Sequence, residues 1–477
     1  MSDNLKASVV SGMKWLAVSK FIIQLLRWGA TFWVIRLLNS EDYGIMAIVG
    51  IMTAILMSGN FLSIGNVIIR FKIVSKPILD TLFTLTILLG ILFTAIQFFL
   101  APWFASFYET EQAELVLQLM AFTYFIEALS VRPMALLAKQ MKFKVLAKID
   151  LIMGVITPAS VLVAAYLGMG YWAIAIGLVV NSLVKSITSN LLMKTDFTFG
   201  MHFKRTSRLL SFGLQNSISS IIAEINSQLD FIVGGYYFTT SQLGIYSVGL
   251  QISFIPLRKL SPELRRIAFP AFSKINNDKP RVLSYYLKSI RLISLFVFPL
   301  FFGLGLVAEP LIEVVLTSKW IESAIIIQII CFALPFRLLT ETSIGMLNAL
   351  GLSNIVLKNN IITIVVFVLA VIPLIDTGIT GLAWAWVISI MAAYIKMLYE
   401  ITKILPTNVF SIIRALSPSL LASIIMILII IVANLSLEIE GATLLCVDIL
   451  AGGVGYFLAV FFGNRSLLQE LQNMFKK

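Results

Sequence analysis

The sequence predicts an all-α polytopic membrane protein with about fourteen transmembrane helices. The first observation is composition: 59% of the 477 residues are hydrophobic, only 13% are charged, and the mean hydropathy is +0.96. The second is that apolar runs of about 20 residues, the length that crosses a bilayer as a helix, recur along the chain. The third is that the short connections between these runs alternate in charge.

The apolar runs place the predicted spans in order along the chain. They cover residues 15–38, 43–69, 78–100, 114–138, 146–168, 170–193, 209–237, 243–263, 285–308, 323–348, 355–375, 378–400, 416–434 and 441–463. Basic connections such as "KQMKFKVLAK" alternate with acidic ones such as "NSED" and "FYETEQAE". The positive-inside rule then puts the basic loops and both termini in the cytoplasm.

The same composition argues against several other classes of protein. The net charge of +12 follows from basic loops beside apolar spans, so we expect no nucleic-acid partner. Cys331 and Cys446 lie far apart in apolar runs, and His202 is the single histidine, so we expect no metal site and no Ser-His-Asp triad. A Walker-type phosphate loop is missing, and we expect no cofactor. The apolar first segment has no signal-peptide cleavage pattern, so we expect it to be retained.

An internal repeat divides the predicted spans. "NSEDYGIMAI" at 39–48 aligns with "TTSQLGIYSV" at 239–248, so that Gly44 matches Gly244. The offset drifts only from 200 to 211 through the next matches, which are Pro102 with Pro310, Gln118 with Gln328, Phe122 with Phe332, Gly170 with Gly381 and Lys185 with Lys396. We predict a six-helix lobe at 1–208, a second at 209–404, and two extra helices with a cytoplasmic tail at 405–477. With an even number of spans each, the lobes are related by an axis along the membrane normal.

The first predicted span carries a polar stripe in mid-membrane. Lys20, Gln24, Arg27 and Thr31 follow i, i+4, i+7, i+11 spacing, which aligns them on one helix face. An arginine at the centre of a membrane helix costs roughly 2.5–3.5 kcal/mol on insertion scales. We therefore expect Arg27 to face a wet cavity rather than lipid.

The repeat-equivalent seventh span carries a second stripe, which favours a cavity shared by the lobes. Its polar residues are Asn216, Ser220, Glu224 and Ser227 on one face, with Asn226 and Asp230 beside them. We predict a substrate site made by Arg27, Lys20, Gln24, Asn216, Ser220, Asn226 and Arg258, although Arg258 fits an ordinary cytoplasmic anchor equally well.

Structural ion pairs are the alternative for every charge inside the membrane. Glu224 or Asp230 could neutralise Arg27 or Lys20. Arg132 and Glu341 occupy near-equivalent repeat positions, as do Glu127 and Arg337, and these pairs fit a role in locking helices together. Glu224, Asp230 and Glu127 are also the acids that could couple transport to a proton or sodium gradient.

Five motifs resemble one transporter family over essentially the whole chain. They are "GMKW" with a span ending "LLNSEDYGI", then "INSQLDFIVGGYYFTTSQLGIYSVG", "AFPAFSKI" and "GYWAIAIG". These motifs resemble the Wzx-type flippases of the polysaccharide transporter family, in the multidrug/oligosaccharidyl-lipid/polysaccharide exporter (MOP) superfamily, close to the colanic-acid exporter group.

The resemblance implies a function that composition alone does not give. It implies a bacterial inner-membrane protein that moves an undecaprenyl-diphosphate-linked oligosaccharide from the cytoplasmic to the periplasmic leaflet by alternating access. The product would serve O-antigen, capsule or exopolysaccharide synthesis, with membrane lipids and polysaccharide assembly proteins as further contacts. Two alternatives stay open: a MATE-like drug exporter, expected to have an acidic cavity, and a membrane polymerase or glycosyltransferase, expected to have a sizeable catalytic loop.

Overall fold

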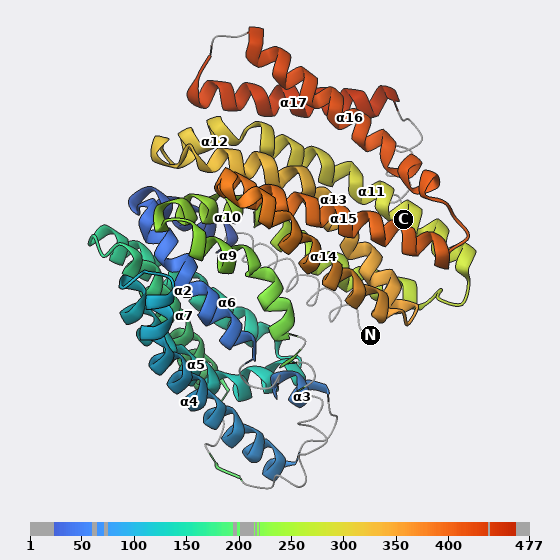
Figure 1. Cartoon of the computed structure of the whole chain (residues 1–477). Coiled ribbons are helices and arrows are strands. Elements are labelled where there is room, and N and C mark those ends of the chain that lie inside the picture. The colour runs from blue at the N-terminus through green and yellow to red at the C-terminus, as the bar shows by residue number, and fades with distance from the viewer. Residues whose placement is uncertain are drawn as a thin grey trace, which may run out of the picture. The chain divides into compact units, whose positions relative to one another are not determined.

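The computed structural model describes residues 23–59, 64–70, 75–193, 198–200, 214, 217–218, 220–436 and 439–463. Within these ranges every regular element is a helix, as Figure 1 shows. The predicted all-α class is therefore confirmed. Many large apolar side chains on these helices are exposed, among them Phe99, Leu167 and Leu450. A surface with so many exposed apolar side chains is typical of a protein that contacts lipid rather than water.

Eleven helical stretches are long and apolar enough to cross a membrane, counting only the described residues. They are Ser40–Ile69, Lys76–Phe107, Gln112–Lys139, Phe143–Tyr166, Tyr171–Leu192, Lys279–Leu306, Ser323–Ala349, Ser353–Thr377, Ile379–Ile404, Val409–Ser436 and Gly441–Gly463. Each contains or overlaps one predicted span. The predicted first span is helical over residues 23–37, and the predicted eighth lies inside α10 (Thr240–Ser273). The predicted seventh ends in α9 (Leu229–Tyr237), which follows a helical stretch at 220–227.

The chain forms two compact units, residues 1–244 and 245–477. The first contains α2 (Ser40–Gly59), α3 (Ile64–Arg70), α4 (Lys76–Phe107), α5 (Gln112–Lys139), α6 (Phe143–Tyr166), α7 (Tyr171–Leu192) and α9. In this unit α5 is central: it packs along α4 and α7 and also contacts α2 and α3, while α6 packs on α7. Buried residues of α2, α4, α5 and α7 form one apolar cluster around Met120.

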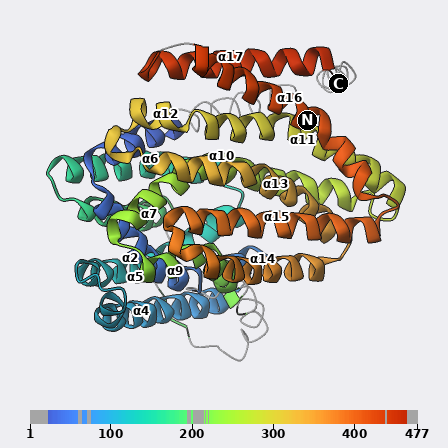
Figure 2. The same cartoon turned by 45° about the horizontal axis from the view of Figure 1, so that its top comes forward.

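The second unit contains most of α10 and the rest of the chain. Its helices are α11 (Lys279–Leu306), α12 (Ala308–Val315), η2 (Ser318–Trp320), α13 (Ser323–Ala349), α14 (Ser353–Leu374), η3 (Ile375–Thr377), α15 (Ile379–Ile404), α16 (Val409–Ser436) and α17 (Gly441–Gly463). Here α13 packs along α11 and α15, and α14 packs on α15. The last two helices, α16 and α17, form an antiparallel hairpin that lies against α11 (Figure 2).

The two units repeat the same set of helix pairs. The contacts α4–α5, α5–α7 and α6–α7 in the first correspond to α11–α13, α13–α15 and α14–α15 in the second. The sequence repeat predicts this correspondence, because its offset aligns predicted spans 3–6 with spans 9–12. The lobe boundary at 208–209 stays a prediction.

A close crossing inside the first unit uses the two glycines that the repeat aligns. A Cβ on Gly44 would lie 1.7 Å from the carbonyl oxygen of Thr240, and a Cβ on Gly244 would lie 1.7 Å from that of Ser40. The hydroxyls of Ser40 and Ser241 are 2.7 Å apart at the same place. Only glycine permits backbones to approach this closely. The aligned residues thus play the same physical role at both positions.

Candidate functional site

The predicted stripe on the first helix packs along α6. Gln24, Arg27 and Thr31 lie in the helical residues 23–37, whereas Lys20 lies outside the described residues. Arg27 Nη2 is 3.4 Å from the backbone oxygen of Asp150 on α6, and the guanidinium lies over Gly154. The Arg27 side chain is exposed and forms no ion pair with another described residue. The glycine leaves room for the guanidinium, so among the described residues the charge of Arg27 has a backbone carbonyl as its polar neighbour.

In the second predicted stripe, the Glu224 carboxylate accepts hydrogen bonds from residues that follow it closely in the chain. Glu224 Oε1 accepts from Ser227 Oγ and from Gln228 Nε2, both at 3.1 Å. Asn226 has a buried Oδ1 with no hydrogen-bond partner among the described residues. Asp230 is buried at the start of α9, and Ser220 is exposed. Asn216 lies outside the described residues, so the predicted site is seen only in part.

Arg258 is exposed on α10, two residues after Pro256. The predicted shared cavity between the lobes stays a prediction.

Glu127, the third predicted coupling acid, has a partner that sequence reasoning did not assign. Its Oε2 is 2.7 Å from Lys185 Nζ on α7 and accepts a second, longer hydrogen bond of 3.3 Å from Ser130 Oγ. The Glu127 side chain is 7% exposed and that of Lys185 29%. The pair ties α5 to α7. The only earlier sign of Lys185 was its alignment with Lys396.

A cavity of about 300 Å³, lined mostly by apolar residues, opens beside Glu127 inside the first unit. Helices α2, α5 and α7 line it, with Thr53, Thr123, Glu127, Asn181 and Ser182 as its polar residues. Two hydrogen bonds position Thr53 in the cavity wall. Tyr124 donates its hydroxyl hydrogen to Gln97, and Gln97 Nε2 lies 3.4 Å from Thr53 Oγ1.

Two other charge pairs behave as the locks that the sequence suggested. Arg132 Nη2 is 3.2 Å from Asp80 Oδ1, joining α5 to α4, and both side chains are buried. Glu341 on α13 pairs with Arg265 on α10 at 2.5 Å. Each pair joins neighbouring helices within one unit. The partners Asp80 and Arg265 were missed because each lies far away in sequence.

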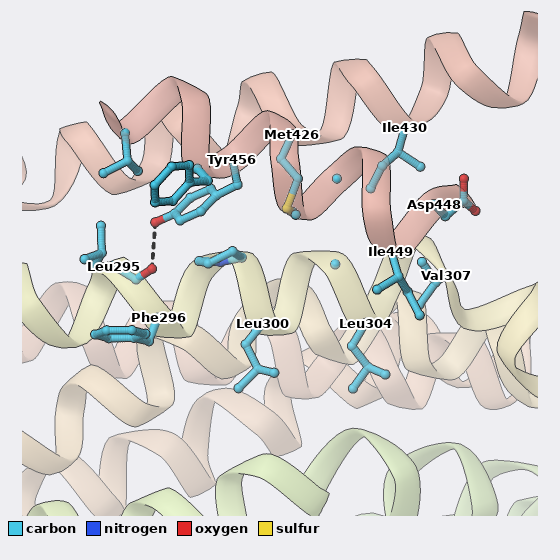
Figure 3. Close-up of a pocket in the computed structure, with 16 residues that line it drawn as sticks. Leu295, Phe296, Leu300, Leu304, Val307, Met426, Ile430, Asp448, Ile449 and Tyr456 are labelled. Carbon is cyan, nitrogen blue, oxygen red and sulfur yellow. Dashed lines mark hydrogen bonds between the residues drawn. The ribbon is translucent and has the colours of Figure 1, made fainter. Parts of the chain in front are cut away.

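An apolar groove of about 710 Å³ runs between α11 and the α16–α17 hairpin in the second unit, as Figure 3 shows. Leu295, Phe296 and Tyr456 lie at one end, where the Tyr456 hydroxyl donates to the Leu295 carbonyl oxygen at 2.7 Å. The buried Asp448 lies at the other end and is the one acid or base among the lining residues. The groove suits a hydrocarbon chain rather than a polar ligand.

Comparison with known proteins adds a family to this geometry. The family model described as polysaccharide biosynthesis protein matches residues 34–325. An uncharacterized membrane protein in the cps region of Klebsiella pneumoniae is 24% identical over 99% of both chains. The lipopolysaccharide biosynthesis protein WzxC of Escherichia coli is 23% identical over 77% of this chain and 75% of its own length.

Among solved structures, the lipid II flippase MurJ in an inward closed conformation superposes with a TM-score of 0.75. The match covers 95% of this chain and 99% of MurJ at 15% identity, so it shows a common fold. The family match and this fold together confirm the resemblance to polysaccharide transporters that the motifs indicated.

Proposed function

Since the chain belongs to the polysaccharide biosynthesis protein family, we propose that it is a flippase for a lipid-linked oligosaccharide. It would move an undecaprenyl-diphosphate-linked glycan from the cytoplasmic to the periplasmic leaflet of a bacterial inner membrane by alternating access. The family description and the name of the E. coli relative both refer to polysaccharide synthesis, which favours a glycan over a drug as cargo.

The observation that carries the proposal is the positive charge of Arg27 on the first helix. Arg27 is exposed on a membrane helix and has no acidic partner among the described residues, although such a charge is costly in lipid. A diphosphate supplies the missing counter-ion. One guanidinium about 4 Å from a phosphate oxygen contributes roughly 4 kcal/mol at an effective dielectric constant of 20. A few such contacts offset the withdrawal of the head group from water without trapping it.

The uncharged polar residues of the stripes would bind the sugars. Gln24, Ser220 and Asn226 offer donors and acceptors suited to hydroxyl groups, and the buried Oδ1 of Asn226 still has capacity to accept. Lys20, Asn216 and Arg258 stay in the proposed site on the sequence pattern. The lipid chain can remain among apolar helix surfaces, and the groove beside α11 is one such surface.

The direct test is reconstitution of the full chain in vesicles with a fluorescent undecaprenyl-diphosphate oligosaccharide. We expect label to move between leaflets only in vesicles that contain the protein, and a drug-like organic cation to show no protein-dependent movement. Protein-dependent movement of the cation alone would favour the MATE-like alternative.

The site is tested by Arg27→Ala and Arg27→Lys in the same vesicles. We expect Arg27→Ala to abolish flipping with near-normal membrane abundance, and Arg27→Lys to retain part of it, because an ammonium keeps the charge but loses the bidentate fork. Arg36→Ala, nearer the end of the same helix, is the matched control and should flip normally. If Arg27→Ala is lost from the membrane and Glu224→Gln restores export, Arg27 is structural and the head-group site is wrong.

The orientation of the chain is a separate proposal: both termini are cytoplasmic. Single cysteines at the exposed positions Asn39 and Ser436 should react with an impermeant reagent added from the periplasmic side, and one at Asn277 should not. Asn39 serves better than Ser40, whose hydroxyl packs against Ser241. The reverse labelling pattern would invert the topology.

A further inference from the structure

The cavity of the first unit that borders Glu127 is separate from the residues proposed to bind the head group. Its volume of about 300 Å³ leaves room for several waters at ~30 Å³ each. Most of its lining is apolar, but Thr53, Thr123, Asn181 and Ser182 lie on it together with Glu127 and supply the few polar partners that a bound water needs. A cavity of this kind, next to a buried ion pair on membrane helices, can bring protons to the acid through water.

The ion pair depends on very few contacts. Oε2 of Glu127 contacts Lys185 Nζ at 2.7 Å and accepts from Ser130 Oγ at 3.3 Å. With its side chain 7% exposed, the carboxylate has little access to bulk water. A buried carboxylate that loses its cation is neutralised by a proton rather than left charged.

The cavity also offers the Lys185 ammonium other oxygen atoms to bind. Asn181 and Ser182 precede Lys185 by four and three residues on α7, so all three share one helix face. Thr123 precedes Glu127 by four residues on α5 and lines the same cavity. The long, flexible lysine side chain can therefore exchange the carboxylate for neutral oxygens and water.

We propose that Glu127 is a proton-binding site, and that its protonation opens the pair with Lys185 and releases the ammonium into the cavity. The proton comes from water in the cavity and adds to a carboxylate oxygen. The ion pair that ties α5 to α7 is then lost, so the packing of the first unit depends on whether the proton is bound. This gives the proposed flippase a way to sense a proton gradient, and that second step rests on the proposed function.

The other charged groups on the helices around Glu127 are few. Helix α2 has none after Asp42, and Lys185 is the only one on α7. The remaining charged residues on α5 and on the helices packed against it are Arg70, Lys76, Asp80, Glu114, Arg132, Lys139, Lys144, Lys148 and Asp150, and the tyrosines on these helices are Tyr43, Tyr124, Tyr166 and Tyr171. Asp80 is paired with Arg132, and Tyr124 with Gln97. Among the described residues, Lys185 is thus the cation that contacts the Glu127 carboxylate.

The matched control is the other buried acid–base pair on the same helix. Asp80 and Arg132 also join α5 to a neighbour, but neither lines the cavity. Asp80→Asn removes a buried acid just as Glu127→Gln does, and Arg132→Met is added to it if the arginine left without its acid keeps the single variant from accumulating. A purely structural role for Glu127 predicts that the two variants behave alike.

The first experiment follows carboxyl protonation directly, by infrared difference spectroscopy of the purified full chain between high and low pH. We expect a protonated carboxyl band that disappears in Glu127→Gln and persists in Asp80→Asn. Identical difference spectra for the parent protein and Glu127→Gln overturn the proposal. If Glu127→Gln does not accumulate, Glu127→Gln combined with Lys185→Gln removes both charges and supplies the same comparison.

The second experiment measures flipping in vesicles with and without an imposed pH gradient. We expect the gradient to accelerate flipping by the parent protein and by Asp80→Asn, and to have no effect on Glu127→Gln, which keeps its gradient-free rate. Gradient acceleration that survives in Glu127→Gln overturns the coupling step. A parent protein that flips nothing overturns the proposed function instead, and leaves the infrared result to decide the proton site.

Discussion

The two units place opposite charges at the same repeat position. Glu127 on α5 and Arg337 on α13 are related by an offset of 337 − 127 = 210, the offset that also relates Gln118 to Gln328. Glu127 borders a cavity that also holds hydroxyl and amide groups, and it pairs with Lys185. The Arg337 guanidinium lies between two aromatic rings, 5.5 Å from the centroid of Phe254 and 5.6 Å from that of Trp386.

The difference shows how one scaffold can carry two kinds of site. An arginine keeps its charge at every accessible pH, and the faces of aromatic rings stabilise that charge. A carboxylate beside a lysine can change its charge by binding one proton. The lysine aligned with Lys185 differs as well. Lys396 Nζ lies 3.9 Å from Glu400 on its own helix and donates to the backbone oxygen of Ile355 on α14 at 3.5 Å, so its link to a second helix is through a carbonyl rather than a carboxylate. The proton site that we propose belongs to the position in the first unit.

The largest expected effect tests whether the aligned glycines are equivalent. Gly44→Ala and Gly244→Ala each drive a methyl group into a backbone carbonyl 1.7 Å away, and backbone cannot yield as a side chain tip does. We expect each to cost about 3 kcal/mol or more, at the top of the range for overpacking. Both variants should be strongly depleted in membranes and unfold at lower temperature in detergent.

The control for these glycines is Gly50→Ala, on the same helix as Gly44. A Cβ there has nothing within 4 Å, so abundance should stay near that of the parent protein. Tolerance of Gly44→Ala together with loss of Gly244→Ala would break the equivalence of the two positions.

The next effect compares the two lock pairs. Arg132→Met leaves Asp80 buried without its cation, which typically costs 3–5 kcal/mol. Glu341→Gln leaves Arg265, whose side chain is 60% exposed, free to recover hydration, so we expect about 1 kcal/mol or less. Thermal unfolding of both variants should show the larger loss in the first unit. Asp80→Asn added to Arg132→Met should recover part of it, and equal losses for the two single variants would contradict the burial argument.

The sequence predicted the helices better than their partners. Hydropathy and the i, i+4 pattern depend on neighbouring residues, so the spans and the placing of Gln24, Arg27 and Thr31 on one helix could be found from the chain alone. Lys185 and Glu127 are 58 residues apart, and Asp80 and Arg132 are 52 residues apart (132 − 80), on helices whose packing no local pattern specifies. The cavity beside Glu127 depends on three helices at once. The repeat was the one long-range signal, and it correctly paired Gly44 with Gly244 and α5 with α13.

The smallest expected effect is at Arg337, and it tests whether the proton site is confined to the first unit. Arg337→Lys keeps the charge but loses the planar face that stacks on Phe254 and Trp386, so we expect a stability loss of about 1 kcal/mol in thermal unfolding. The protonated carboxyl band and the response of flipping to a pH gradient should both be unchanged, because the residue has no proton to exchange. A variant that stayed folded yet lost its gradient response, as Glu127→Gln is expected to do, would mean that the charge in the second unit takes part in coupling. The contrast between an exchangeable acid and a permanent cation would then no longer separate the two units.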